Sequence, residues 1–71
     1  MVFILANNFE TARQYVQDTG VDEWRFIFGP LTLKGRRRPI KYVKIGKWWQ
    51  RSDKTEIEEL LDALGAKEVP L

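Results

Sequence analysis

The feature that most constrains the fold is a continuous apolar run, Val2–Ala6, which ends at Asn7 and Asn8. A strand with one solvent-facing side alternates apolar and polar side chains, whereas an unbroken apolar run is typical of a strand buried on both faces. Burial on both faces requires a layer of structure on each side of the sheet. We therefore expect a parallel sheet with Val2–Ala6 at its centre.

The run is followed by a predicted helix and then by a second strand. Asn7 and Glu10 have capping-box spacing, with Asn7 as N-cap, and apolar side chains recur at three-to-four-residue intervals through Asn8–Thr19. Gly20 is typical of the residue that ends a helix. In the predicted strand Trp24–Phe28, one face carries Trp24, Phe26 and Phe28. The other face carries Arg25 and Ile27, and this alternation suits an edge strand.

The second half of the chain predicts one more strand and one more helix. Its segments are an ambiguous stretch that is either a single helical turn or extended (Leu31–Pro39), a third strand (Ile40–Ile45), a loop (Lys47–Arg51) and a second helix (Lys54–Leu64). Asp53 and Glu56 repeat the capping-box spacing before that helix. We expect the tail after Gly65 to be loosely held.

These segments form one α/β domain that covers residues 1–71, in the order β-α-β-β-α. A strand–helix–strand unit forms a right-handed crossover between parallel strands. If the third strand lies on the other side of the first, the sheet has three mainly parallel strands in the order 2-1-3, with helices on both faces. The alternative is an antiparallel hairpin of strands two and three, with both helices on one face. The doubly apolar first strand favours the parallel arrangement.

The composition argues against an enzyme and against a metal or cofactor site. The chain has no Cys and no His, which removes disulfides, thiolate ligands and the commonest general base. It contains no glycine-rich phosphate-binding motif of the GxGxxG or Walker type. No run approaches the roughly 20 apolar residues of a membrane span, and we expect a cytoplasmic protein without a membrane partner.

A basic segment, residues 34–51, is the strongest functional signal. It holds eight of the twelve Lys and Arg residues and no acid, whereas two basic and four acidic residues precede it and two basic and six acidic residues follow it. Cations neutralise phosphates, and aromatic rings stack on unpaired bases. We therefore expect binding of single-stranded nucleic acid or DNA through nine residues: Arg36, Arg37, Arg38, Lys41, Lys44, Lys47, Trp48, Trp49 and Arg51.

Other interpretations of this segment remain open. Lysines on an edge strand deter aggregation, and one tryptophan can cover the end of the sheet while its neighbour stays exposed. The cations can also pair with the acidic second helix, within the molecule or across a homodimer. Trp and Arg dominate the energetics of protein interfaces, so the same surface suits docking on another protein.

Three stretches carry a resemblance to a known group: NNFETARQYV, then DEWRFI, then VKIGKWWQRSDKTEIEELLDALGA. The chain resembles small uncharacterised proteins of tailed phages that infect actinobacteria. In that group an Ala-Arg-aromatic stretch is matched here by Ala12, Arg13 and Tyr15 and is followed by Trp24. A Gly-x-Trp-aromatic-x-Arg-x-Asp stretch then precedes the last helix, matched here by Gly46, Trp48, Trp49, Arg51 and Asp53.

This resemblance implies a Rossmann-like layout, a phage origin and no known activity. The arginine run and the lysine-rich third strand depart from the pattern of the group. Nucleic-acid binding is therefore not implied by the resemblance and rests on this sequence alone. For a phage protein, docking on a protein of the bacterial host is the natural alternative.

Overall fold

The computed structural model describes residues 1–37 and 39–69, which form a parallel sheet with two α-helices. The strands are β1 (Val2–Leu5), β2 (Trp24–Phe26), β3 (Lys41–Lys44) and β4 (Lys67–Glu68). Their order is β2-β1-β3-β4, and each neighbouring pair is parallel. The sequence-based order of the first three strands is confirmed, but the expectation of a three-stranded sheet is wrong because the tail adds β4.

The central place of β1 follows from its apolar side chains. Val2, Phe3 and Ile4 lie opposite residues of both β2 and β3 in the sheet register. Ile4 and Leu5 point to opposite faces and have no exposed surface. A strand of this composition is stable only where both faces are covered.

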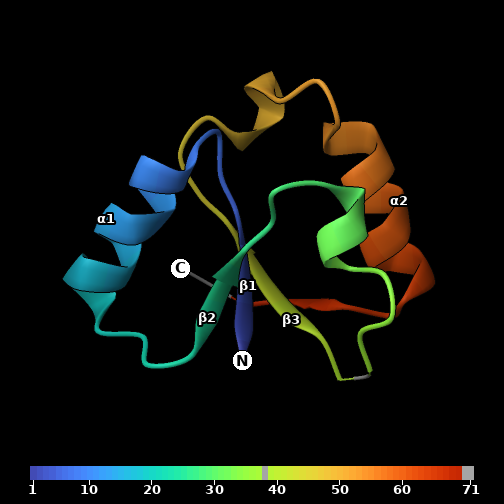
Figure 1. Ribbon diagram of the computed structural model, residues 1–71, viewed down its shortest axis with the longest axis horizontal. Helices are drawn as coiled ribbons and strands as arrows, with labels where there is room; N and C mark the ends of the chain where they lie inside the picture. The colour runs from blue at the N-terminus through green and yellow to red at the C-terminus, as the bar shows by residue number, and fades with distance from the viewer. Residues whose placement is uncertain (38, 70–71) are drawn as a thin grey trace.

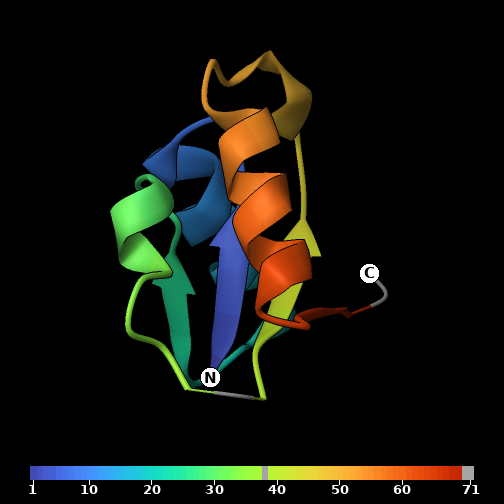
Figure 2. The same cartoon turned by 90° about the vertical axis from the view of Figure 1, so that its right-hand side faces the viewer.

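The two helices cover opposite faces of the sheet, as Figures 1 and 2 show. Each face has its own buried cluster. The α1 side contains Ile4, Ala6, Ala12, Phe26, Val43 and Ile45. The α2 side contains Phe3, Leu5, Ile27, Leu33, Ile40, Ile57 and Leu61. The parallel, two-sided arrangement is confirmed, and the alternative hairpin with both helices on one face is excluded.

Helix α1 (Phe9–Thr19) begins one residue later than predicted. Asn8, with extended backbone, is the N-cap, and its side-chain oxygen accepts a hydrogen bond from the Thr11 backbone N–H at 2.9 Å. Asn7 as N-cap was therefore wrong. The two adjacent asparagines offer the same capping chemistry, and the spacing to Glu10 selected the wrong one.

Helix α2 (Lys54–Ala63) begins without the predicted side-chain cap. Asp53 occupies the N-cap position, but its side chain makes no capping hydrogen bond. Its two carboxylate oxygens accept hydrogen bonds from Arg51 instead, both at 3.0 Å. The capping box of Asp53 and Glu56 is thus replaced by an ion pair.

The tail contributes β4 instead of hanging loose. The Lys67 N–H donates to the Ile40 carbonyl at 2.9 Å, and the Val69 N–H donates to the Tyr42 carbonyl at 2.7 Å. The expectation of a loosely held tail is therefore wrong for residues 67–69, and residues 70 and 71 lie outside the described part of the chain.

Two short 3-10 helices complete the fold: η1 (Pro30–Thr32) in the ambiguous stretch and η2 (Trp48–Gln50) in the predicted loop. Strand β2 ends two residues before the predicted end, since the Phe28 N–H donates to the Thr32 hydroxyl at 3.2 Å. None of the helices in the described ranges has the length and apolar character that a membrane crossing requires.

Candidate functional site

Those residues predicted to bind nucleic acid that the structure describes lie at two opposite ends of the sheet. Strand β3 runs between them and spans about 13 Å for its four residues. Arg36 and Arg37 lead to the amino end of β3, near the bottom of Figure 1, whereas η2 stands beyond its carboxyl end, at the top. A segment that is continuous in sequence therefore forms two separate surfaces.

At the carboxyl end, Arg51 is committed to contacts within the protein. Its guanidinium Nη1 donates to the carbonyls of Ala6 and Ile27, and Nη2 donates to the Phe28 carbonyl at 2.8 Å. Nε and Nη2 also donate to the two carboxylate oxygens of Asp53. These bonds use all five N–H donors of the guanidinium. The side chain is only 9% exposed, so Arg51 has no donor left for a phosphate.

Arg51 lies at the carboxyl edge of the sheet, beside the position where an open parallel sheet usually binds its ligand. Such sheets bind ligands beyond the carboxyl ends of their strands, where the strand order reverses, which in this sheet is between β1 and β3. Ala6 follows β1, and Ile27 and Phe28 follow β2, so one side chain joins both strand ends. The guanidinium carbon also lies 5.5 Å from the centre of the Phe26 ring. This arrangement ties the carboxyl ends of β1 and β2 together.

Lys44 is held by its own surroundings as well. Its ammonium lies 3.3 Å from a carboxylate oxygen of Glu58 on α2 and 4.5 Å from the centre of the Trp48 ring. The Lys44 side chain is 17% exposed. The predicted pairing between the basic segment and the acidic helix thus exists at this position.

The two tryptophans differ in exposure. Trp48 is partly buried and packs against the α2-side core, while Trp49 is 51% exposed. Their rings meet edge to face with centroids 6.2 Å apart. Trp49 and the exposed Lys47 are therefore the accessible members of the predicted set at the carboxyl end.

At the amino end, the described arginines are not neutralised by α2. Arg36 Nε donates to the Thr32 carbonyl at 3.0 Å, and its guanidinium carbon lies 5.5 Å from the centre of the Phe3 ring. Arg37 is exposed, and no ion pair joins either arginine to an acid in residues 1–37 and 39–69. Arg38 lies outside the described residues.

Sequence reasoning missed a cation at this end, Lys67. Lys41 and Lys67 are register partners in β3 and β4, and both side chains are exposed on the α1 side of the sheet. We call Arg36, Arg37, Lys41 and Lys67 the amino-edge basic surface; it wraps around the amino end of the sheet, with Arg36 over Phe3 on the α2 side and the two lysines on the α1 side. Because β4 has only two residues, the sequence pattern carried no usable signal for its pairing.

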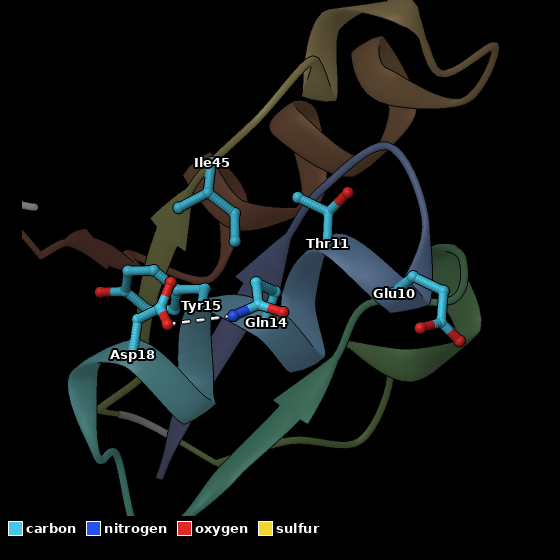
Figure 3. A pocket seen from close by; sticks show the side chains of 6 residues that line it. All are labelled: Glu10, Thr11, Gln14, Tyr15, Asp18 and Ile45. Atoms are coloured by element: carbon cyan, nitrogen blue, oxygen red, sulfur yellow. Dashed lines mark hydrogen bonds between the residues drawn. The ribbon is translucent and has the colours of Figure 1, made fainter.

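A shallow groove of about 450 Å³ runs along α1. Figure 3 shows its lining: Glu10, Thr11, Gln14, Tyr15, Asp18 and Ile45. Gln14 donates to Asp18 across one helical turn at 3.0 Å. The lining carries two acids and no base, so the groove does not suit a phosphate.

Tyr42 on β3 carries a partly buried phenol. Burial raises the pKa of the Tyr42 phenol; the nearby Lys44 opposes this change and Glu68 adds to it. The phenol therefore stays protonated at neutral pH. Within residues 1–37 and 39–69, no group of three His, Cys, Asp or Glu side chains is placed to hold a metal ion.

Comparison with protein-family profiles, curated proteins and solved structures finds no match to the chain.

Proposed function

We propose that the chain is a small non-enzymatic binding protein whose amino-edge basic surface binds the phosphates of nucleic acid. This proposal is supported by one observation: no acid in the described residues forms an ion pair with a cation of this surface. Among the described residues, Glu58 of α2 pairs with Lys44, and no acid of α2 pairs with Arg36 or Arg37. When exposed, unpaired cations of a protein contact phosphates, the counterions held by the nucleic acid are released. This release favours binding.

The proposal assigns unequal roles to the residues first predicted. Arg37, Lys41 and Lys67 contact phosphates, and Arg36, which is partly buried over Phe3, positions the segment that carries Arg37. Arg38 belongs to the same segment of the sequence and is included in the proposal on its charge. Arg51 is excluded because its donors are used internally, and Lys44 is excluded because its side chain is only 17% exposed and pairs with Glu58. Trp49 stands at the far end of β3. Base stacking on Trp49 therefore requires a nucleic-acid strand that passes along the sheet from the basic surface.

We expect the double substitution Arg37→Ala and Lys41→Ala to weaken binding to every oligonucleotide sequence alike. The reason is that phosphate contacts carry no sequence information. The measurement is fluorescence anisotropy of a labelled single strand and a labelled duplex over a series of salt concentrations. Each lost contact should reduce the slope of log affinity against log salt by about 0.7 for the single strand and 0.9 for the duplex.

The matched control is Lys47→Ala with Lys54→Ala, which removes the same charge at the other end of the molecule. This control should keep most of the salt slope. Equal losses in both variants would mean that only net charge matters and would refute a localised surface. No binding by the wild-type chain at low salt would refute the proposal as a whole.

A second candidate function, docking on another protein, is supported by exposed apolar side chains near the carboxyl edge. Phe28 is 70% exposed and Leu31 is 78% exposed. The Phe28 ring stacks on Phe9 with an interplanar angle of 10° and centroids 6.1 Å apart. Exposed apolar patches often mark interaction sites. If the chain comes from a phage, as its resemblance implies, the partner is a protein of the bacterial host.

We expect a photo-crosslinking residue at position 28 to form a covalent adduct with one defined bacterial protein. The same residue at Glu59, which is exposed on α2, is the control. Leu31→Ser should weaken the adduct at position 28 because it removes an exposed apolar neighbour. Equal adducts at positions 28 and 59, or none at 28, would contradict docking through this patch.

A further inference from the structure

The groove along α1 lies on the same face of the sheet as two lysines of the amino-edge basic surface. Lys41, Val43 and Ile45 alternate along one extended stretch, so their side chains share the α1 side. Lys67 lies opposite Lys41 on that side. Ile45 lines the groove, and along the chain it is about 13 Å from Lys41. The groove and the two lysines therefore belong to one surface of the molecule.

The floor of the groove is apolar and partly aromatic. Ile45 is buried, and the half-buried Tyr15 packs against the α1-side cluster. In Figure 3 the Ile45 side chain extends towards the Tyr15 ring. The volume of about 450 Å³ lies within the range of ligand pockets, about 300–1,000 Å³. An aromatic ring beside aliphatic surface suits a flat ligand such as an unpaired base.

The rim of the groove offers hydrogen-bond acceptors. The exposed carboxylates of Glu10 and Asp18 can only accept, and neither has an ion pair within residues 1–37 and 39–69. The Gln14 amide donates to Asp18, and the Thr11 hydroxyl donates to Asn8, both at 3.0 Å. These donors are engaged within α1 and its cap. The groove therefore favours a ligand that presents hydrogen-bond donors.

The charges on this face determine how a nucleotide lies on it. The two carboxylates repel phosphates from the groove, whereas Lys41 and Lys67 attract them to the amino end of the sheet. Helix α1 runs back towards that end in Figure 1, and Asp18 is the next-to-last residue of the helix. Asp18 is therefore the rim acid that lies nearest the amino end.

We propose that the groove holds an unpaired base with an exocyclic amino group, while Lys41 and Lys67 contact the neighbouring phosphates. This inference rests on the proposed phosphate binding and narrows its substrate to single strands with amino-bearing bases. The N4 amino group of cytosine donates to carboxylates, whereas uracil has a carbonyl at that position, as thymine does. In a duplex the bases are stacked and paired, so only the phosphate contacts remain.

Matched single strands test this assignment. We expect oligodeoxycytidine to bind about tenfold more tightly than an abasic strand of the same length, measured by fluorescence anisotropy at low salt. It should also bind more tightly than oligodeoxyuridine, whose ring differs at the amino position. Equal binding of the cytidine strand and either comparison strand would overturn this inference and leave phosphate binding intact. No binding of any strand would overturn both.

Substitutions in the groove separate its role from that of the lysines. Asp18→Asn should reduce the preference for the cytidine strand over the uridine strand, because one carboxylate acceptor becomes an amide. Asp22→Asn makes the same charge change at an exposed position outside the groove and should keep the preference. Lys67→Ala should lower the salt slope for cytidine and abasic strands alike. A preference that survives Asp18→Asn unchanged would overturn the assignment.

The aromatic contact has its own variant. Tyr15→Leu keeps an apolar side chain and should lower the affinity for the cytidine strand to that for the abasic strand. Circular dichroism checks its fold, and Asp18→Asn, at an exposed position, supplies the test if Tyr15→Leu does not fold. A short arginine peptide is the competing ligand. If Asp18→Asn weakens binding of that peptide and leaves the cytidine strand unaffected, the groove belongs to a cationic partner and the proposal is wrong.

Discussion

Replacement of Arg51 by alanine is expected to lower the free energy of unfolding by about 3–5 kcal/mol, a large part of the stability of a small domain. The substitution removes every donor from the carbonyls of Ala6, Ile27 and Phe28 at the ends of β1 and β2. It also leaves the Asp53 carboxylate, whose side chain is 28% exposed, without its cation. Urea denaturation followed by circular dichroism measures the change.

Arg51→Lys should recover only a small part of this loss. An ammonium has three donors on one atom and cannot reach Asp53 and two strand ends in the planar geometry of a guanidinium. Lys47→Ala, four residues away at an exposed position, is the control and should change stability by less than about 0.5 kcal/mol. If Arg51→Ala were as stable as the wild type, Arg51 would be free to bind phosphate, and its exclusion from the proposed site would be wrong.

The sheet could be predicted because its strongest signal is local. The run Val2–Ala6 has no polar face, so only the centre of a two-sided layer suits it, and the two amphipathic helices supply the two sides. The expected position of β1 between β2 and β3 follows from that single fact. By contrast, β4 depends on backbone hydrogen bonds to β3, among them those donated by Lys67 and Val69. Backbone bonds of this kind leave almost no trace in side-chain pattern.

The candidate site was harder to predict because closeness in sequence is not closeness in space. The basic segment appeared to be one surface, but β3 passes through it and separates Arg37 from Lys47 by the height of the sheet. Charge alone also could not distinguish Arg51, which is partly buried and fully bonded, from Arg37, which is exposed. The sequence pattern predicts Asp53 as a helix cap, but its side chain is the ion-pair partner of Arg51.

The turn after β3 depends on a small residue that touches α1. Gly46 has a φ of 60°, a conformation that L-residues adopt at a cost of about 1–2 kcal/mol. A methyl group there would lie 2.9 Å from Cγ2 of Thr11. Thr11 cannot easily withdraw, because its hydroxyl and its backbone N–H both donate to the Asn8 side chain at the start of α1. The close contact therefore joins the end of β3 to the cap of α1.

We expect Gly46→Ala to lower the free energy of unfolding by about 3 kcal/mol, as the sum of backbone strain and overpacking. Gly35→Ala separates the two effects, since Gly35 has a φ of 76° but no atom within 4 Å of the added methyl group. It should cost only the backbone strain, about 1–2 kcal/mol.

Thr11→Ser removes Cγ2 and keeps the hydroxyl that donates to Asn8. In the Thr11→Ser background, Gly46→Ala should therefore cost no more than Gly35→Ala does. Urea denaturation of the four variants closes a double-mutant cycle, and the coupling energy should equal the overpacking part, about 1–2 kcal/mol. Equal costs for Gly46→Ala and Gly35→Ala, with no coupling to Thr11, would show that the turn after β3 and α1 are independent. In that case the cap at Asn8 would form without constraint from the end of the sheet.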